Sequence, residues 1–493
     1  RGTVIRIDFF FEKMPRWMHG IVARAGLAFN CLVLATMAVV SFDFVQMFGG
    51  DMALYLGHRK RAKRMTPLLG AGLSILLLCG LLVFRIPMVV AIMAVVFFGN
   101  FMSGAWMMTL PQTMMSGIGR FVLIALPLFV LAGGLMNAGG ISGRIFEFAR
   151  ALVGAFRGGL AHVNVVTSMF FGGMIGSSTA DLAGTGSIVI PEMKKNGYPA
   201  DFSAALTASS AGIGPMIPPS SPMILYSAMT GVSLGALFLA GLIPGLLLGL
   251  SQMMIVALLA KRRGWKAYAD FSLDEVWRTG RRAILSFGMP LIIVGGLVIG
   301  VFTPSEAGAF AVVYALVLAM LVHRVLDLRG LYRVLANAVQ MSGELLIIVG
   351  LSFALGSALT NARVPEFLVE FIDMVTVVDS MYLRLLALLI LAILAGMILD
   401  PLIPVLMPII LPTLIAYDVD LVHFGVLMVI AVVIGQVTPP MAIALIIAGK
   451  IANVDQIRVM RANTPFFLGI VCFLLIAIAV PGLATWLPAL VRN

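Results

Sequence analysis

The feature that most constrains this chain is a series of about a dozen apolar stretches, each roughly 20 residues long, between residues 22 and 488. A stretch of that length is what an α-helix needs to cross the hydrocarbon core of a bilayer. Of the 493 residues, 61% are hydrophobic and 11% are charged, whereas a soluble protein carries about 25% charged residues. The sequence therefore predicts an all-α polytopic membrane protein and argues against a soluble enzyme or a disordered chain.

The positive charges lie in short segments between the apolar stretches. The chain has 33 basic and 22 acidic residues, and the basic ones cluster, for example, at 261–263 and 278–282. Cytoplasmic loops of membrane proteins carry such an excess of Lys and Arg. The net charge of +11 therefore indicates an orientation in the lipid bilayer and not a nucleic-acid partner. Segments 261–282 and 323–333 are predicted to be cytoplasmic, and the non-basic loop 303–306 to lie on the outer side.

Residues 1–66 differ from the rest of the chain. They combine an aromatic, charged segment, one apolar stretch and the basic run 59–64. After this run, the sequence is almost uniformly apolar. We therefore predict two parts, a short leading part over 1–66 and a large membrane part over 67–493. The last apolar stretch is predicted to cross the membrane as one span over 464–488.

Two apolar stretches are interrupted by Gly and Pro at corresponding places. Segment 213–219 reads IGPMIPP and segment 434–440 reads IGQVTPP, 221 residues further on. Upstream of each interruption the triplet GMI recurs, at 173–175 and 396–398, which are 223 residues apart. This double match predicts two repeats in the membrane part. Their approximate bounds are 120–260 and 335–490.

A Pro-Pro pair inside a membrane helix has a physical consequence. It removes two backbone donors and clashes with the preceding turn, so the helix must break. Broken backbone at membrane depth persists only where it is buried in protein or lines a polar cavity. Gly and Pro also make plain kinks in membrane helices, but paired breaks in two halves of a transporter favour a binding site near the midplane. Gly214 and Gly435 are predicted to require glycine, because a β-branched side chain would not fit a tight break.

Polar residues at the breaks are the candidates for this site. Ser177, Ser178, Thr179 and Asp181 lie at the first upstream interruption. Their oxygens could bind a hard cation or cap a helix; we favour cation binding for the serines and capping for Asp181. Asp400 lies at the second upstream interruption, and a carboxylate inside the membrane is a functional candidate.

Catalytic and nucleotide-binding signatures are missing from the sequence. It contains no G-x-S-x-G, H-E-x-x-H or Walker A pattern. An intramembrane enzyme that uses Asp400, Asp181 or His162 is a remote alternative, since no paired acid–base spacing is visible. Ion-coupled transport fits the sequence better than ATP hydrolysis, and we predict that the chain is not an enzyme.

Several motifs resemble one transporter family. They are Phe170–Gly186 (FFGGMIGSSTADLAGTG), the segment from Gly212 to Ser220 that surrounds the first Pro-Pro pair, and Pro127–Asn137 (PLFVLAGGLMN). Together they resemble the large membrane subunit of the tripartite ATP-independent periplasmic (TRAP) transporters, over roughly 67–490. Residues 1–48 more weakly resemble part of the small membrane subunit of these transporters, which would make this a fused chain.

The resemblance implies an elevator fold of the ion-transporter superfamily, with inverted repeats and two re-entrant helical hairpins. It also implies two Na⁺ sites at the hairpin tips and the facing breaks. Relatives commonly have a serine where this chain has Ile175, and Ser177 could replace it. The first site would use Ser177, Ser178, Gly214, Ile217 and Pro218. The second would use Gly396, Gly435, Thr438 and Met441. The residues predicted to line the substrate cavity are Thr179, Asp181, Pro219, Ser220, Asp400, Pro439 and Pro440.

The function implied by the resemblance is Na⁺-coupled uptake of an organic acid across the bacterial inner membrane. The substrate would be a C4-dicarboxylate or a sialic-acid-like carboxylate, delivered by a periplasmic substrate-binding protein. The small membrane subunit, fused or separate, would be the second partner, and no organic cofactor is expected. A stand-alone Na⁺/dicarboxylate symporter that needs no binding protein is the alternative.

Overall fold

The computed structural model describes residues 88–103, 109–361, 364–376, 380–439 and 441–492, together with Leu77, Gly80, Leu81 and Ile86. The predicted leading part over 1–66, with its likeness to a small membrane subunit, lies outside the described residues. Pro440 lies outside them as well.

The described residues form helices and contain no strand, which confirms the predicted all-α class. The first helices are α6 (Met88–Ser103), α7 (Thr109–Ile118), η1 (Phe121–Ile124), α8 (Ala125–Ala138) and α9 (Ile141–Val153). Next come α10 (Gly159–Ile175), α11 (Ser178–Asp181), the π-helical turn η2 (Leu182–Gly186), α12 (Ser187–Lys195), α13 (Ala200–Ala211), η3 (Gly214–Met216) and α14 (Ser221–Thr230).

The middle of the chain forms long helices. They are α15 (Leu234–Arg263), α16 (Leu273–Val298), α17 (Pro304–Val317), the π-helical turn η4 (Leu318–Val322), α18 (Leu328–Asn361) and α19 (Val364–Val375). The remaining helices are α20 (Met381–Gly396), α21 (Leu402–Ala416), α22 (Leu421–Gln436), α23 (Ile443–Ala452), α24 (Gln456–Ala479) and α25 (Gly482–Arg492).

The chain divides into two compact units. The smaller unit comprises residues 1–110 and 354–364, and among its described residues Leu81, Ala91 and Ala94 form a buried apolar cluster. The larger unit comprises 111–353 and 365–493. Both predicted helix breaks lie in the larger unit.

Six helices in the described part are long and apolar enough to cross a membrane. They are Phe121–Ala138, Leu234–Arg263, Leu273–Val298, Pro304–Val322, Leu328–Asn361 and Gln456–Ala479. Several shorter apolar helices accompany them, among them the two helices that flank the second break, Leu421–Gln436 and Ile443–Ala452. The apolar helices agree with the predicted polytopic membrane protein.

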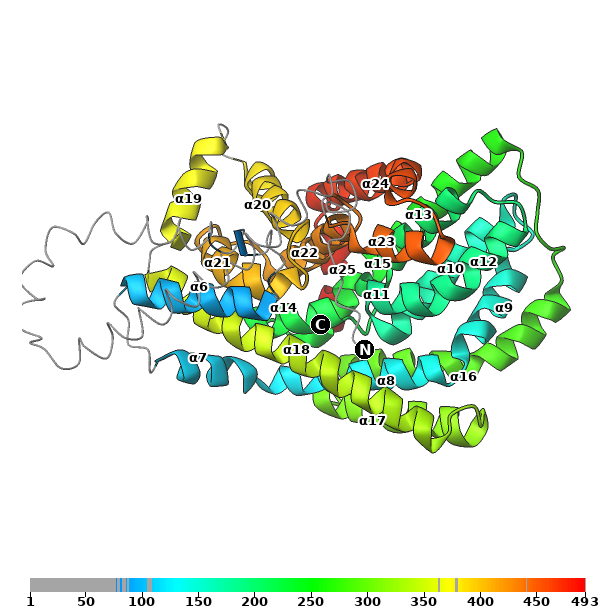
Figure 1. Ribbon diagram of the computed structural model, residues 1–493, viewed down its shortest axis with the longest axis horizontal. Coiled ribbons are helices and arrows are strands. Elements are labelled where there is room, and N and C mark those ends of the chain that lie inside the picture. Colours follow the sequence, from blue (N-terminus) through cyan, green and yellow to red (C-terminus); the bar gives the residue numbers. More distant parts are fainter. Residues whose placement is uncertain are drawn as a thin grey trace, which may run out of the picture. The chain divides into compact units, whose positions relative to one another are not determined.

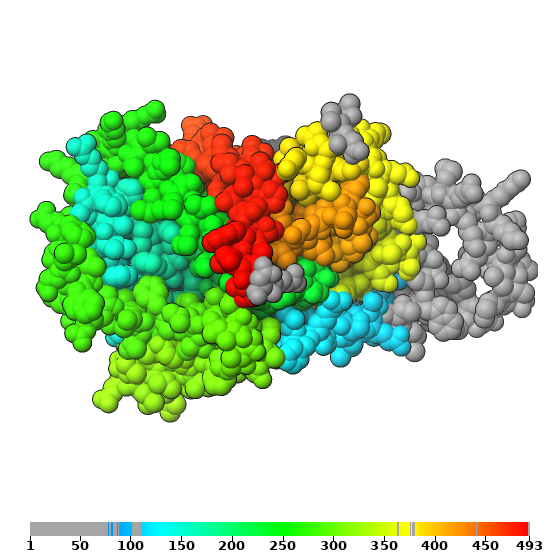
Figure 2. All heavy atoms as spheres, turned by 180° about the vertical axis from the view of Figure 1, so that it is seen from behind, coloured from blue at the N-terminus to red at the C-terminus, as the bar shows by residue number. Residues whose placement is uncertain are grey.

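The long helices pack closely through small residues. Helix α17 runs beside α8 (Figure 1), and a methyl group added at Gly308 of α17 would lie 2.8 Å from Cβ of Leu128 on α8. Small residues of this kind allow membrane helices to approach each other. Helix α25 packs against α15, and α24 and α25 (red) lie on the face that Figure 2 shows.

The prediction of a single span over 464–488 is wrong. Helix α24 ends at Ala479 and α25 begins at Gly482. Pro481 lies between them, and a proline disfavours the helical conformation of the residue before it. Val480 accordingly has a non-helical conformation, with φ −125° and ψ 77°.

Candidate functional site

The first upstream interruption is the tip of a helical hairpin. Helix α10 ends at Gly176, whose φ of +62° is left-handed, and the chain restarts as a helix at Ser178. After α12, the hydroxyl of Tyr198 meets the backbone N–H groups of Leu160 and Ala161 at the start of α10. The segment from α10 to α12 therefore returns to the side from which it entered, as a re-entrant hairpin does.

The first Pro-Pro break lies across this tip. Helix α13 ends at Ala211, and α14 starts at Ser221 after an irregular segment. A methyl group at Gly172 would lie 2.7 Å from Cα of Gly214, and one at Gly176 would lie 1.8 Å from the carbonyl oxygen of Pro219. The backbone N–H of Ser221 donates to the carbonyl of Gly176 at 3.3 Å. Backbone thus packs directly on backbone where the two interruptions meet.

The second half of the chain forms an equivalent hairpin from α20 and α21. The guanidinium of Arg384, at the start of α20, lies 4.6 Å from the ring centre of Tyr417, which follows α21. Arg384 Nη2 also pairs with Asp373 Oδ1 at 3.2 Å. These contacts join the two ends of the hairpin, so it too returns to its starting side. Its tip contains the Asp400–Pro401 peptide bond, which is cis, as is the Pro218–Pro219 bond of the first half.

The second Pro-Pro break faces the tip of the second hairpin. A methyl group at Gly435 would lie 2.8 Å from both the carbonyl carbon and the carbonyl oxygen of Gly396. The pairing is shifted by one residue relative to the sequence match, because Gly172, and not Gly173, is the closest neighbour of Gly214. The two glycines also differ in the space around them, because a methyl group would clash at Gly435 but not at Gly214. A methyl group at Gly214 would meet only Cα of Gly172, at 3.5 Å, which is an ordinary contact.

The two breaks meet each other in the interior of the larger unit. A methyl group at Gly212 would lie 2.4 Å from Cγ1 of Val433, and α22 contacts η3. The Tyr226 hydroxyl of α14 donates to the carbonyl of Leu421 at the start of α22, at 2.7 Å. The starts of the two breaks therefore lie against each other in the interior of the larger unit.

The first broken helix comprises α13 and α14, and the second comprises α22 and α23. A second contact joins α12, which precedes the first broken helix, to the end of the second. Lys194 of α12 donates to the carbonyl of Ala452, the last residue of α23, at 2.8 Å. The base of the first hairpin thus lies beside the end of the second broken helix. The start of that broken helix, at Leu421, contacts the end of the first broken helix instead. The two broken helices therefore run in opposite directions.

The residues predicted for the first Na⁺ site lie together and are largely buried. Ser178 is 2% exposed and its hydroxyl has no hydrogen-bond partner among the described residues. Ser177 is bonded through its hydroxyl to Thr179, at 3.1 Å. Within the described part, no backbone N–H donates to the carbonyls of Gly214, Ile217 or Pro218. The first break thus collects oxygen atoms that are free to bind a cation.

The residues predicted for the second Na⁺ site are more exposed. Gly435 is buried, and Gly396, Thr438 and Met441 are half-buried; the neighbouring Pro439, predicted for the substrate cavity, is exposed. The carbonyl of Gly435 accepts from the N–H of Thr438 at 3.2 Å. The Thr438 hydroxyl donates to the carbonyl of Ile434, which leaves its oxygen lone pairs available.

The expected capping role of Asp181 is wrong. Asp181 is 1% exposed, and its Oδ1 accepts a 2.7 Å hydrogen bond from Thr185 Oγ1. It caps no helix start, because the turn that follows it, η2, has no side-chain cap. At the first break, the helix with a side-chain cap is α14, since the N–H of Met223 donates to Ser220 Oγ at 3.3 Å. Ser220 is fully buried, so its hydroxyl shapes the break from inside.

Sequence reasoning missed Gln436. Its side-chain amide hydrogen-bonds the carboxylate of Asp400, and its Oε1 is buried without a partner among the described residues. Asp400 itself is exposed. The signal was present, because Gln436 stands inside the IGQVTPP motif where the first half has Pro215.

Sequence reasoning also missed a buried polar cluster between α10 and α13. Asn164 Nδ2 donates to Thr207 Oγ1 at 2.7 Å, and the hydroxyls of Ser168 and Ser210 are 3.2 Å apart. Ser168 also bonds Asp181. The spacing of four residues between Asn164 and Ser168 places both on one helix face, which is the signal that could have revealed the cluster.

The amino-acid sequence is similar to those of known transporter proteins. The family model "Tripartite ATP-independent periplasmic transporter, DctM component" matches residues 73–483. The chain belongs to this family. The large permease protein SiaM of the sialic acid TRAP transporter of Vibrio cholerae is 36% identical over 381 residues, which are 77% of this chain and 89% of SiaM. The large permease protein DctM of the C4-dicarboxylate TRAP transporter of the same organism is 32% identical over 449 residues, 86% of this chain and 99% of DctM.

The fold of this DctM-family chain also resembles a solved structure. The crystal structure of the YdaH transporter of Alcanivorax borkumensis, described as having an unusual topology, superposes with a TM-score of 0.53 at 15% identity. The match covers 77% of this chain and 90% of YdaH. At this identity the likeness concerns the fold alone. The membership in the TRAP large-permease family and the apolar helices make the chain a multi-pass protein of the bacterial inner membrane.

Proposed function

We propose that this chain is the large membrane subunit of a transporter that imports an organic carboxylate with Na⁺. A periplasmic substrate-binding protein delivers the substrate, and the small membrane subunit completes the complex. The family membership supports this proposal, as do the relatives named for sialic acid and C4-dicarboxylates. The binding protein selects the substrate first, and the permease then transfers it across the bilayer.

The observation that carries the proposal is the contact of each hairpin tip with a broken helix. The Gly172–Gly214 and Gly396–Gly435 contacts hold unwound backbone inside the protein. Unwound carbonyls in discontinuous membrane helices can coordinate Na⁺. In the first site, Na⁺ would bind the hydroxyl of Ser178 and the carbonyls that the first break leaves unpaired. In the second, it would bind Thr438 together with the backbone of Gly396, Gly435 and Met441.

The direction of the half-helices favours an anionic substrate. Helices α14, α21 and α23 each start at one of the interruptions. The amino end of a helix carries a partial positive charge and free N–H groups, which bind carboxylates. Of the predicted cavity residues, Asp181, Pro219 and Ser220 are buried, whereas Asp400 and Pro439 are exposed. We therefore propose that the substrate reaches the site from the side of the second break.

Transport then requires the site to change sides. We propose that Na⁺ fixes the two tips against the two breaks and completes the substrate site. The loaded hairpins and broken helices would next slide past the remaining helices as an elevator. Without Na⁺, the tips would lack the ion that joins them to the breaks, and the substrate site would be incomplete.

The test is uptake into proteoliposomes that contain the chain with its small membrane subunit. Radiolabelled sialic acid and succinate serve as probes, each with and without the cognate binding protein and an inward Na⁺ gradient. We expect uptake only when both the binding protein and Na⁺ are present. Uptake without the binding protein would select the stand-alone symporter, and uptake without a Na⁺ gradient would refute the coupling.

Thr438 gives the matched variant for this experiment. Thr438→Ala removes the hydroxyl proposed to bind Na⁺, and Thr438→Ser keeps it. We expect the alanine variant to insert normally in the membrane but to need at least about fivefold more Na⁺ for half-maximal uptake, which corresponds to one lost hydrogen-bond-strength contact of ~1 kcal/mol. The serine variant should behave like the unchanged chain. An unaltered Na⁺ dependence of Thr438→Ala would remove Thr438 from the site.

A further inference from the structure

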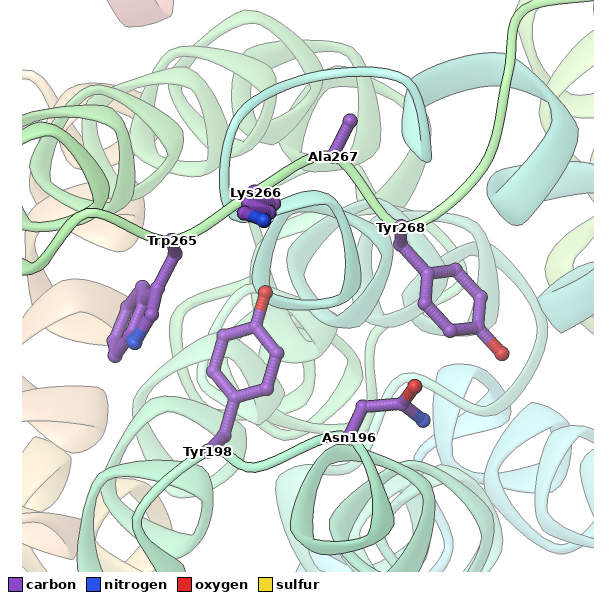
Figure 3. A pocket seen from close by; sticks show the side chains of 6 residues that line it. All are labelled: Asn196, Tyr198, Trp265, Lys266, Ala267 and Tyr268. Carbon is purple, nitrogen blue, oxygen red and sulfur yellow. The ribbon is translucent and has the colours of Figure 1, made fainter.

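A cavity of about 180 Å³ lies at the base of the first hairpin, between the end of α12 and the loop after α15. Figure 3 shows the loop that follows α15 passing over the end of α12, with the Tyr198 hydroxyl pointing toward that loop. The residues that line the cavity are Asn196, Tyr198, Trp265, Lys266, Ala267 and Tyr268. The substrate site proposed above uses none of them.

The loop that forms one wall is firmly held. The N–H of Gly158 donates to the carbonyl of Lys266 at 3.1 Å, and the N–H of Tyr268 donates to the carbonyl of Gly154 at 3.0 Å. Gly158 has a φ of +75°, and a methyl group there would lie 2.8 Å from Cβ of Ala260. Glycine is thus required for the start of α10 to approach the end of α15, from which the loop leaves, so closely. The wall is therefore built into the fold.

Aromatic rings from the loop and from the segment after α12 pack together at the cavity. The ring centres of Trp265 and Tyr198 are 4.7 Å apart, and those of Trp265 and Phe202 are 4.6 Å apart. The guanidinium of Arg263 lies 5.3 Å from the ring centre of Trp265. Burial raises the pKa of Tyr198 to about 12, so its hydroxyl stays neutral at physiological pH and can act as a donor.

The charged groups near the cavity differ in whether they have partners. Glu192 is the nearby carboxylate, and its Oε1 already accepts from Tyr268 at 3.0 Å and from Asn196 at 3.2 Å. Its Oε2 lies 3.9 Å from the ammonium of Lys195. The Lys266 ammonium, by contrast, has no ion-pair or hydrogen-bond partner among the residues that the structure describes. The cavity therefore presents a positive charge without a counter-ion.

The position of the cavity relative to the membrane indicates the source of an anion that could pair with the Lys266 ammonium. Helix α15 carries Lys261, Arg262 and Arg263 in its last turn, which places this end on the cytoplasmic side. Trp and Tyr concentrate at the level of the lipid headgroups. Large apolar side chains near the same loop are exposed, with Phe156 at 51% and Phe271 at 58%. Lipid chains would cover such side chains.

We propose that this cavity binds the phosphate group of an anionic phospholipid from the cytoplasmic leaflet. The Lys266 ammonium pairs with the phosphate, and the Tyr198 hydroxyl and the Trp265 ring border the headgroup. The acyl chains lie along the exposed apolar side chains of Phe156 and Phe271. Basic pockets between membrane helices on the cytoplasmic side bind anionic headgroups in this way.

Lipid binding to the purified full chain in detergent tests the proposal. Native mass spectrometry would measure the affinity for phosphatidylglycerol, for phosphatidylcholine and for soluble glycerol phosphate. The variants are Lys266→Gln, which removes the charge, and Lys266→Arg, which keeps it. Lys261→Gln removes an exposed charge from the same helix end but not from the cavity, and serves as the control.

We expect Lys266→Gln to bind phosphatidylglycerol about fivefold more weakly, the effect of one basic residue near an anionic membrane surface. Lys266→Arg and Lys261→Gln should bind it normally, and phosphatidylcholine binding should be the same in all four proteins. Equal phosphatidylglycerol affinity in Lys266→Gln, or an equal loss in Lys261→Gln, would overturn the proposal. Binding of glycerol phosphate that depends on Lys266, with no such effect for the lipid, would show a soluble anion instead and overturn the assignment to a lipid.

Discussion

Gly435→Ala is the sharpest test of the contact between the second tip and the second break. The added methyl group would lie 2.8 Å from the carbonyl carbon and oxygen of Gly396, whereas ordinary contacts begin at 3.4 Å. The difference, 3.4 minus 2.8, is 0.6 Å. The obstructing atoms are backbone atoms, so no side chain can rotate away. The tip and the break must move apart by about this distance, which exceeds the ~0.5 Å tolerance of a binding site.

The expected cost follows from this displacement. Overpacking of a tight interior costs about 1–3 kcal/mol. If the whole of this cost falls on Na⁺ binding at the second site, the dissociation constant for Na⁺ rises about fivefold to 150-fold. The assay is the rise in the thermal unfolding temperature of the purified chain when Na⁺ replaces choline, because a ligand of the folded state stabilises it by RT ln(1 + [L]/Kd), so weaker Na⁺ binding gives a smaller rise at the same Na⁺ concentration. This readout needs no knowledge of the substrate.

Gly214→Ala is the matched control in the first half. Its methyl group would have Cα of Gly172 as its nearest neighbour, at 3.5 Å, so we expect Na⁺ affinity within about twofold of the unchanged chain, well under 1 kcal/mol. The reasoning would be refuted if Gly435→Ala kept its full response to Na⁺. Equal damage from both substitutions would also refute it, because the two positions differ in space and not in sequence context.

Three further predictions concern stability, each measured by thermal unfolding in detergent. Gly176→Ala should lower the free energy of unfolding by at least ~2 kcal/mol, because its φ is +62° and the methyl group would lie 1.8 Å from the oxygen of Pro219; an unaltered stability would contradict the geometry of the tip. Tyr226→Phe should cost about 0.5–1.5 kcal/mol, because the 2.7 Å hydrogen bond from its hydroxyl to the half-buried carbonyl of Leu421 is lost; a neutral effect would show that water replaces the hydroxyl. Burial lowers the pKa of His323, so the unfolded chain binds a proton more readily, and stability should fall as the pH drops through and below about 6.5. His323→Gln should reduce that fall, and an identical pH profile would exclude His323 as its source.

The positions of the breaks could be predicted from the sequence because their cause is local. Pro218 and Pro219 lack backbone donors wherever the segment lies, so the helix before them must end. The same holds at Asp400–Pro401, where α20 has ended and α21 starts at Leu402. The membrane class was equally predictable, since apolar length alone limits how such a chain can be solvated.

The contacts between the breaks could not be predicted, because they depend on packing. The sequence match aligns Gly173 with Gly396, but in space Gly172 is the residue that packs on Gly214. The two breaks also differ in exposure, since Ser220 is fully buried and Pro439 is exposed. No local pattern encodes this difference, because it arises from which neighbouring helices cover each break.

The buried polar cluster between α10 and α13 explains why Gly172 packs against Gly214. Along α10, Asn164, Ser168 and Gly172 follow one another at intervals of four residues and therefore share a helix face. Asn164 bonds Thr207 and Ser168 bonds Ser210 on the facing helix. In an apolar helix pair, many sliding positions bury similar surface, whereas a displaced polar pair would leave buried donors and acceptors unsatisfied.

The two polar contacts therefore fix the register between α10 and α13. The next residue on the same face of α10 is Gly172, and four residues beyond Ser210 is Gly214. Once the polar pairs are formed, the two glycines must meet, and position 172 requires glycine because a methyl group there would lie 2.7 Å from Cα of Gly214. A cluster that takes no part in ion binding thus determines where the first hairpin tip meets the first break.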